Sequence, residues 1–335
     1  MTSVTGAGNP ATTDTDWQPT ASLGALRERA RQLAYVRDFF ARRGVLEVET
    51  PVLSHCGVTD VNIDSVAATV LPVPGHDGRA GWLQPSPEYH MKRLLAAGSG
   101  SIYQVYRAFR DGERGRRHNP EFSLLEWYRT GITDTELMAE VADLVCGWLD
   151  CPRPGVLSYG EAMHKYVGID PFTISDTALI ERCGPWVDAA LAAELGRDGC
   201  LDLLLSHELE PALREQPPVF ICHYPASQAA LAKISVVNGV EVAHRFELYV
   251  AGIELCNGYW ELTDAGEQRQ RFTLDNQQRS RLGKPVMPVD ELLVQALEAG
   301  LPECSGVALG LDRLLMLKLG ADSIADVLAF PFERA

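Results

Sequence analysis

The chain has 335 residues, of which 46% are hydrophobic and 22% are charged. This composition is that of a globular protein, which excludes a wholly disordered or collagen-like chain, and the length suggests about two domains. The formal net charge of −15 argues against a protein whose whole surface coats nucleic acid, so a phosphate site would have to be a local basic cluster.

Nothing in the sequence points to secretion or to a membrane. The first 26 residues contain no Lys or Arg and no apolar run, so they lack the features of a signal peptide. No apolar run is long enough for a transmembrane helix. The eight cysteines include no C-x-x-C pair, which favours reduced cysteines over a zinc site or a disulfide framework. We therefore expect a cytoplasmic protein without membrane contact.

The hydrophobic periodicity predicts helices and strands in an irregular order. Residues 1–21 carry no periodicity and are predicted to be a disordered tail. The predicted helices are 22–43, 87–97, 134–149, a mainly helical stretch over about 156–215, 264–282 and 312–319. The predicted strands are 45–51, 102–110, 122–128, 219–221, 246–256 and 306–309. Strands adjacent in sequence with helices between the groups indicate an α+β fold around a largely antiparallel sheet, flanked by helices.

A basic cluster joins two of the predicted strands. It consists of Arg107, Arg110, Arg114, Arg116, Arg117 and His118. Guanidinium groups bind phosphates through two parallel hydrogen bonds, so a hairpin that presents them could hold a triphosphate. The glycine-rich loops that usually bind nucleotides are absent. The alternative is a solvated loop in which the arginines pair with Asp111 and Glu113.

Two further features suggest a site. Glu254 and Glu261 bracket a strand, and their oxygens are suitable ligands for Mg²⁺, although both could equally be surface residues. The predicted strand at Gly306 turns into a helix whose first turn contains Arg313. A cation is mildly unfavourable at a helix N-terminus, which suggests either a functional role or a salt bridge, to Asp312 or elsewhere.

Together these segments resemble the three signature motifs of the class II aminoacyl-tRNA synthetases, in the same order. The resembling segments are Phe39–Pro51 for motif 1, Phe109–Arg110 with His118–Phe122 and Glu126 for motif 2, and Gly306–Arg313 for motif 3. The resemblance covers about residues 23–335. It implies the class II catalytic core, and a homodimer with twofold symmetry formed through motif 1.

Within class II the chain resembles lysyl-tRNA synthetases. The segments that carry this similarity are Glu49–Pro51, Ser86–Glu88, Lys92–Leu94 and Glu254–Glu261. We expect no anticodon-binding OB domain before motif 1, and residues 22–335 are expected to form one catalytic domain. Pro225–Ala229 and Cys304–Gly310 resemble the ligases that attach (R)-β-lysine to elongation factor P. The resemblance thus implies ATP and Mg²⁺ as co-substrate and cofactor, β-lysine or lysine as substrate, elongation factor P as acceptor, and no tRNA.

The resemblance also implies roles for individual residues. Arg110 would hold the α-phosphate and the attacking carboxylate, Arg313 would hold the γ-phosphate, and Glu254 with Glu261 would bind Mg²⁺. The residues implied for ATP are Arg110, Asp111, His118, Asn119, Phe122, Glu254, Leu255, Gly310 and Arg313. Those implied for the amino acid are Ser86, Pro87, Glu88, Tyr128, Glu261 and Ala308. No residue is identified as the base that deprotonates the acceptor lysine.

Two positions depart from the synthetase pattern. Gly112 stands where family members usually have a glutamate that recognises adenine, so Glu113 or a backbone carbonyl would have to replace that contact. Ala308 stands where lysyl-tRNA synthetases have glycine, and its methyl group would favour a β-amino over an α-amino acid. The alternatives are a minimal lysyl-tRNA synthetase that charges tRNA and a catalytically weak paralogue that senses an amino acid.

Overall fold

The computed structural model describes residues 17–335. A mixed sheet of nine strands forms the centre, with the order β1-β5-β6-β12-β11-β10-β8-β7 and with β9 paired to β10. Its strands are β1 Leu46–Glu47, β5 Ile102–Phe109, β6 Glu121–Thr130, β7 Gly155–Ser158, β8 Val219–Pro225, β9 Ile234–Val237, β10 Val240–Val250, β11 Ile253–Trp260 and β12 Cys304–Gly310. Among the strands between residues 17 and 335, only β1–β5 and β7–β8 pair in parallel, which confirms the predicted largely antiparallel sheet.

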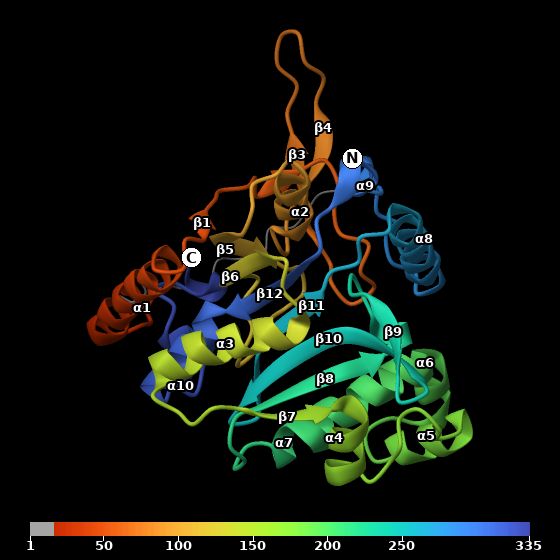
Figure 1. The fold of residues 1–335 in the computed structure, drawn as a ribbon. Helices are drawn as coiled ribbons and strands as arrows, with labels where there is room; N and C mark the ends of the chain where they lie inside the picture. Colours follow the sequence, from red (N-terminus) through yellow and green to blue (C-terminus); the bar gives the residue numbers. More distant parts are fainter. Residues whose placement is uncertain (1–16) are drawn as a thin grey trace, which may run out of the picture.

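One face of this sheet is covered by helices α1 (Leu23–Ala41), α3 (Asp134–Leu149) and α10 (Leu311–Leu319), as Figure 1 shows. Leu125, Trp127, Val307 and Leu309 point into this core, where they are at most 2% exposed. Because side chains alternate along a strand, their neighbours in β6 and β12 point to the opposite face. That opposite face carries the cavity described below.

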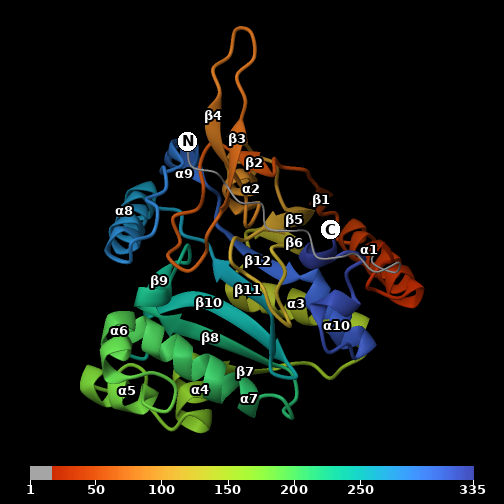
Figure 2. The same cartoon turned by 180° about the vertical axis from the view of Figure 1, so that it is seen from behind.

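A helical lobe packs against the other end of the sheet, below β8 in Figure 1 and on the near side in Figure 2. It contains α4 Tyr159–Tyr166, α5 Asp176–Cys183, α6 Ala189–Leu204, a π-helix at Leu205–Leu209, and α7 Glu210–Ala212. The predicted capping box at its start is present, since Ser158 and Glu161 satisfy each other's backbone amides. This lobe is the mainly helical stretch that the sequence predicts, except that 156–158 belong to β7.

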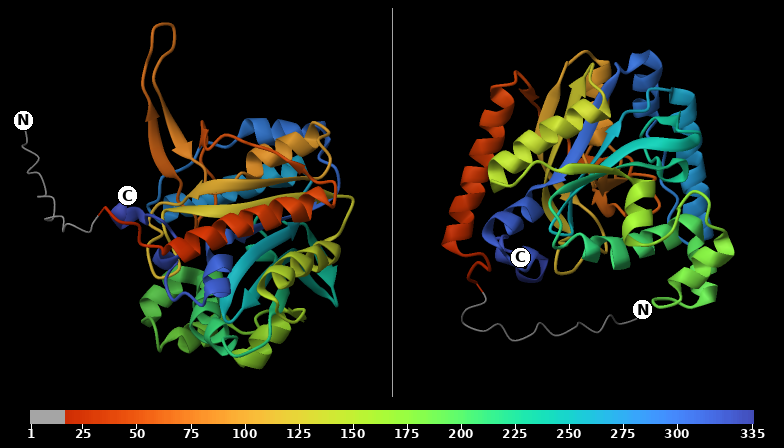
Figure 3. Two further views of the ribbon diagram at one scale, coloured as in Figure 1. Left: turned by 90° about the vertical axis from the view of Figure 1, so that its left-hand side faces the viewer. Right: turned by 60° about the horizontal axis from the view of Figure 1, so that its bottom comes forward.

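A small antiparallel sheet projects from the opposite end of the molecule, above the central sheet. Its strands are β2 Leu53–Ser54, β3 Val66–Val70 and β4 Arg79–Leu83. The hairpin of β3 and β4 extends well beyond the body, as the left view in Figure 3 shows. Helices α2 (Glu88–Ala96) and α9 (Glu291–Gly300) lie at its base, and α8 (Ala265–Arg281) lies beside α9. The sequence did not predict this sheet, β9 or α9.

The predicted element bounds need two corrections at the N-terminal side. Ala21 is 2% exposed and its amide donates to the carbonyl of Leu328. The predicted disordered tail therefore ends before this residue, and its first 16 positions lie outside the described residues. The predicted strand 45–51 is reduced to β1, which pairs only with β5. None of the helices between residues 17 and 335 combines the length and apolar character that a bilayer span requires.

Candidate active site

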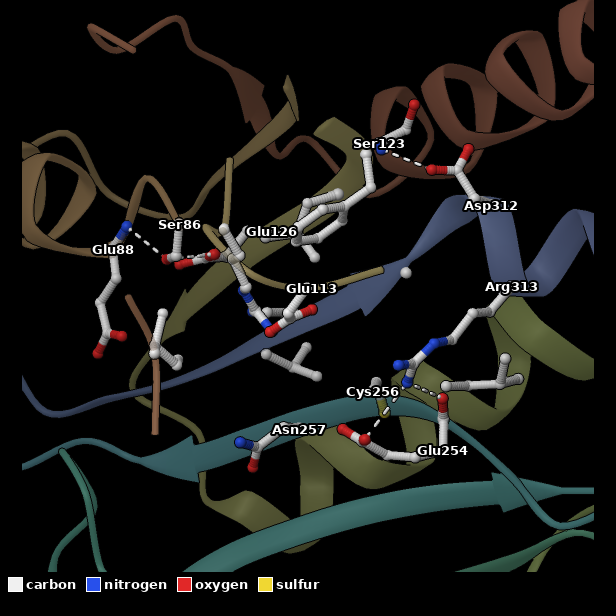
Figure 4. Close-up of a pocket in the computed structure, with 18 of the residues that line it drawn as sticks. Ser86, Glu88, Glu113, Ser123, Glu126, Glu254, Cys256, Asn257, Asp312 and Arg313 are labelled. Carbon is white, nitrogen blue, oxygen red and sulfur yellow. Dashed lines mark hydrogen bonds and ion pairs between the residues drawn. The ribbon is translucent and has the colours of Figure 1, made fainter. Parts of the chain in front are cut away.

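A cavity lies on the sheet face that α1, α3 and α10 leave open. Its floor is formed by alternate residues of three neighbouring strands, namely Glu126 and Tyr128 of β6, Asn257 and Tyr259 of β11, and Gly306 and Ala308 of β12. Figure 4 shows Ser86, Glu88 and Glu126 together at one end of the cavity and Glu254 with Arg313 at the other. The cavity therefore has two chemically different ends.

Glu126 is the centre of the first end. Its carboxylate accepts hydrogen bonds from Ser86 Oγ at 2.8 Å and from Tyr128 Oη at 2.7 Å. Glu126 and Tyr128 are each 2% exposed. Burial, followed by the nearby charge of Glu88, raises the pKa of Glu126 to about 8. A buried carboxyl group with a raised pKa is ready to ionise when a cation enters.

A buried lysine connects two further carboxylates at this end. Lys92 Nζ lies 2.7 Å from Glu88 Oε1, one helical turn away in α2, and 2.6 Å from Glu261 Oε2 at the end of β11. Lys92 and Glu261 are each 1% exposed. Burial is the largest effect on Glu261 and raises its pKa to about 8, although Lys92 opposes this shift. The Lys92 ammonium thus compensates one of the three acidic groups.

Gly306 makes room for these groups. A Cβ atom at this position would lie 2.3 Å from Cε1 of Tyr128 and 2.5 Å from Oε1 of Glu261. Both distances are shorter than non-bonded contacts allow. Glycine is therefore required here because Tyr128 and Glu261 pack directly over the strand.

Arg313 and Glu254 form the opposite end of the cavity. Arg313 Nη1 donates to the Glu254 backbone carbonyl at 2.9 Å and lies 3.3 Å from Oε2 of its carboxylate. Its Nη2 lies 2.8 Å from Nε2 of His118. These contacts explain how a cation is tolerated in the first turn of α10. The salt bridge considered for Arg313 is made with Glu254 and not with Asp312.

Asp312 instead fixes the start of α10. It forms an ion pair with Arg29 of α1, and its Oδ2 accepts from the Ser123 amide at 2.7 Å. Asp312 is 2% exposed. In addition, the Gln32 side chain donates to the Leu311 carbonyl at 3.0 Å. These contacts connect α10 to α1 and to β6. They fix the first turn of α10, which contains Arg313.

The arginine loop between β5 and β6 contributes only part of the predicted basic cluster. Arg110, Arg117 and His118 line the cavity. Arg107, Arg114 and Arg116 do not, because they contact Glu121, the Phe332 ring and Asp322, respectively. The prediction that the whole cluster grips phosphates is therefore wrong for these three. The alternative pairing within the loop is present only for Arg110, whose Nη1 lies 3.5 Å from Glu113 Oε1.

The turn after Arg110 explains the glycine that departs from the family pattern. Gly112 has a φ of +75°, a conformation that favours glycine over a glutamate. Its amide is bonded to Asp111 Oδ1 at 2.9 Å, and Asp111 does not line the cavity. Glu113 lines it instead, so Glu113 is the acidic side chain available near the nucleotide loop.

Phe122 and Asn119 complete this wall. The guanidinium of Arg110 lies over the Phe122 ring, 5.0 Å from its centroid. The side chain of Asn119 donates to the Glu121 carbonyl at 2.6 Å and accepts from the Phe332 amide at 2.9 Å. Asn119 therefore ties the loop to the C-terminal segment, whereas Arg110 and Phe122 present a cation and an aromatic face to the cavity.

The structure does not bring Glu254 and Glu261 together. They lie at opposite ends of β11, seven positions apart, which is roughly 20 Å of strand. Glu261 is paired with Lys92, whereas Glu254 is beside Arg313. The prediction that these two glutamates share one Mg²⁺ is therefore wrong.

The Arg313 end nevertheless fits a divalent cation. Burial and the neighbouring charge of Glu254 raise the pKa of Glu210 to about 7, so two carboxyl groups repel each other there. Carboxylate oxygens near bound phosphates are the usual ligands of Mg²⁺. Glu254 would hold the ion with Glu210 next to it, and the ion would neutralise phosphate charge.

The remaining predicted residues can be placed directly. Those that line the cavity are Ser86, Glu88, Tyr128, Leu255, Ala308 and Gly310, whereas Pro87 does not. Arg117, which the sequence placed in the basic cluster, lines the cavity, whereas sequence reasoning gave no role to Lys92, which contacts Glu88 and Glu261. The sequence did contain a signal for Lys92, because Glu88 and Lys92 are four residues apart on a predicted helix and this spacing favours an ion pair.

The family model for class II tRNA synthetases (D, K and N) matches residues 16–334. Because this match spans nearly the whole chain, the chain belongs to that family. Its α+β fold, with a mixed sheet flanked by helices, is the fold of that catalytic domain. Members of the family are ligases that activate amino acids with ATP and Mg²⁺. The two ends of the cavity agree with this chemistry, since one carries arginines and the other buried carboxylates.

Proposed function

We propose that this protein activates a diamino acid, (R)-β-lysine or lysine, and transfers it to the ε-amine of a lysine on elongation factor P. The observation that carries the choice of amino acid is the charge of the buried end of the cavity. Glu88, Glu126 and Glu261 supply three carboxylates there, and Lys92 supplies one ammonium group. Two negative charges remain when all are ionised, which matches a substrate with two ammonium groups.

The raised pKa values of Glu126 and Glu261, both about 8, support the same conclusion. Buried carboxylates without enough cations are costly, so they hold protons in the free protein. Two substrate ammonium groups would compensate them and lower both pKa values. A substrate with a single ammonium group would leave one carboxyl group protonated or uncompensated.

In the first step, a carboxylate oxygen of the amino acid attacks the α-phosphorus of ATP, and the bond to pyrophosphate breaks. Arg110 lines the cavity beside Phe122 and Glu113, and it would hold both the attacking carboxylate and the α-phosphate. Arg313 can hold the γ-phosphate, because Glu254 and His118 fix its guanidinium. Mg²⁺ bound at Glu254 would neutralise phosphate charge. This chemistry depends mainly on alignment and charge stabilisation.

In the second step, the amine of the acceptor lysine attacks the carbonyl carbon of the adenylate, and AMP leaves. The choice of elongation factor P rests on the resemblance of Pro225–Ala229 and Cys304–Gly310 to the β-lysine ligases. The net charge of −15 supports it, since tRNA binding gains most of its affinity from phosphate contacts. Ala308 pairs with Glu126 across β6 and β12, so its methyl group borders the place of the substrate amine.

We also propose that two copies associate through the motif 1 segment and the residues that flank it. Leu23, Leu46 and Leu53 are 67%, 56% and 44% exposed, although each is a large apolar side chain. A twofold interface would bury them from both copies. Light scattering of the purified chain tests this, since a molecular mass of 36.7 kDa at micromolar concentration would contradict it.

ATP–pyrophosphate exchange with a set of amino acids tests the substrate. The set contains (R)-β-lysine, lysine, and norleucine, which has the carbon skeleton of lysine but lacks the ε-ammonium group. We expect kcat/KM for the diamino acids to exceed that for norleucine by at least about 100-fold, because buried polar groups reject a ligand that leaves them unpaired. Equal exchange with norleucine, or no exchange with any diamino acid, would contradict the proposal.

A further inference from the structure

A second cluster of ligating side chains lies outside the active site. Asp134 is the first residue of α3, His223 belongs to β8 and His244 to β10. One possible ligand atom from each residue lies within 4.8 Å of the other two. Between residues 17 and 335, this is the single group of three or more such side chains that approach so closely. None of the three lines the active-site cavity.

An irregularity between β8 and β10 brings the two histidines together. Ala243 pairs with Tyr224 and Phe246 pairs with Cys222, so His244 and Arg245 together face the single residue His223. This is the arrangement of a β-bulge, which redirects side chains and occurs often beside functional sites. His223 has a φ of 59°, which is uncommon for a residue other than glycine.

The ring of His244 is held on both sides. Its Nδ1 lies 2.9 Å from Asp134 Oδ2, and its Nε2 lies 2.8 Å from Ser235 Oγ. The Trp260 ring packs edge-on against it, with a centroid distance of 5.1 Å. Asp134 is oriented as well, since its Oδ1 accepts from the Thr135 amide at 2.9 Å. Two of the three candidate ligands are therefore already fixed in position.

His223 completes the cluster. Its ring lies edge-on to that of His244, with centroids 5.8 Å apart and planes at 89°. Among the described residues, neither of its ring nitrogens has a hydrogen-bond partner, and the residue is only half-buried. A free imidazole lone pair thus lies beside a fixed imidazole and a fixed carboxylate, and solvent can reach it.

We propose that Asp134, His223 and His244 bind a divalent transition-metal ion of the Zn²⁺ class. Two imidazole nitrogens and one carboxylate oxygen are a donor set that Zn²⁺ accepts, with a fourth position left for water. His244 would ligate through Nδ1, in place of its hydrogen bond to Asp134. Its Nε2 would then carry the proton and donate to Ser235 Oγ, the kind of outer contact that orients metal-binding histidines.

The ion would join three segments that are far apart in the sequence. They are the start of α3, the strand β8 next to the helical lobe, and β10 in the central sheet. Because the unfolded chain does not hold these ligands together, metal binding would stabilise the folded state. The site would therefore act on stability, independently of the amino-acid chemistry at the other face.

Isothermal titration calorimetry of the full chain with Zn²⁺, after removal of metals by a chelator, tests the proposed metal site. We expect one site per chain in the wild type and at least tenfold weaker binding in His223→Asn, since asparagine tolerates a positive φ. His164→Asn, a change at an exposed position in α4, is the matched control and should bind like the wild type. Zn²⁺ should also raise the melting temperature of the wild type but not that of His223→Asn.

Ser235→Ala is the second variant, and it keeps the test decisive if His223→Asn does not fold. Loss of the Ser235 contact should weaken Zn²⁺ binding by about tenfold or more, the usual effect of removing an outer partner. Zn²⁺ binding of equal strength in the wild type and both variants would overturn the proposal. No binding by the wild type would overturn it as well.

Discussion

Arg313 donates a hydrogen bond to Nε2 of His118 across 2.8 Å and so joins the first turn of α10 to the loop between β5 and β6. An arginine in a protein keeps its proton, so His118 must be the acceptor and must be neutral. Burial, followed by the charge of Arg313, lowers the pKa of His118, which agrees with this assignment. The third partner, Glu254, completes a fixed setting for the guanidinium.

Arg313→Lys should strongly reduce activation of the amino acid. Lysine cannot contact Glu254, His118 and a phosphate through one planar group, so the rigid fork is lost. We expect kcat/KM for ATP to fall on the order of 100-fold, as when one transition-state donor is removed. The rate of ATP–pyrophosphate exchange at several ATP concentrations measures this kcat/KM. Arg107→Lys, which changes an arginine outside the cavity, should leave the rate within about twofold; equal losses in both variants would refute the role of Arg313.

Glu126 makes the stability of the ligand-free protein depend on pH. Its folded pKa of about 8 lies above the ordinary value of 4.5, so the folded state binds the proton more tightly than the unfolded state. The contribution of Glu126 to the free energy of unfolding is fully present below about pH 4.5 and is lost as the pH rises towards 8. Between pH 5 and pH 8, the free energy of unfolding should therefore fall less in Glu126→Gln than in the wild type.

Denaturant unfolding at several pH values measures this difference. Glu181→Gln, at an exposed position in α5, is the control and should follow the wild type. A saturating diamino acid should remove much of the pH dependence, because its ammonium groups compensate Glu126. Parallel curves for the wild type and Glu126→Gln would show that the carboxyl group is not perturbed.

Gly306→Ala should block the amino-acid end of the cavity. The new methyl group would collide with the ring of Tyr128 and the carboxylate of Glu261. Overpacking of this kind destabilises a protein by about 1–3 kcal/mol. We expect a lower melting temperature and a large rise in KM for the amino acid. Gly155→Ala has no atom within 4 Å of the added Cβ and should change neither quantity, whereas similar KM values for both variants would contradict the geometry.

Ala308→Gly tests the substrate preference that follows from the proposed function. Removal of the methyl group widens the cavity next to Glu126, so the α-amino position of lysine gains space. The ratio of kcat/KM for lysine to that for (R)-β-lysine should rise, by about 10-fold for the space of one methyl group. Exchange assays with both substrates measure the ratio, and an unchanged ratio would mean that another residue sets the preference.

Much of the fold could be predicted because local signals and the final elements agree. Ser22 caps α1, and Ser158 with Glu161 caps α4, as the spacing indicates. The small sheet at β2–β4 was missed because its strands are short and their side chains largely exposed, so no apolar alternation marks them. The strand at 45–51 was overestimated because β1 pairs only over Leu46–Glu47.

The site residues were found mainly through motif resemblance, and the errors concern how they are arranged. The sequence places Glu254 and Glu261 close in number, but an extended strand holds them far apart. Lys92 received no role because its contact with Glu261 depends on how α2 packs against β11. Its position four residues after Glu88 was visible, whereas its complete burial was not.

The measurement that tests the central claim most directly is the intact mass of elongation factor P. The factor is incubated with the protein, Mg-ATP and (R)-β-lysine or lysine, while tRNA(Lys) is treated in parallel and examined on an acid gel. We predict that the factor gains the mass of one lysine residue, that the tRNA stays uncharged, and that Gly306→Ala abolishes the gain. Charged tRNA with an unmodified factor would contradict the proposed acceptor, and the absence of either product would contradict ligation altogether.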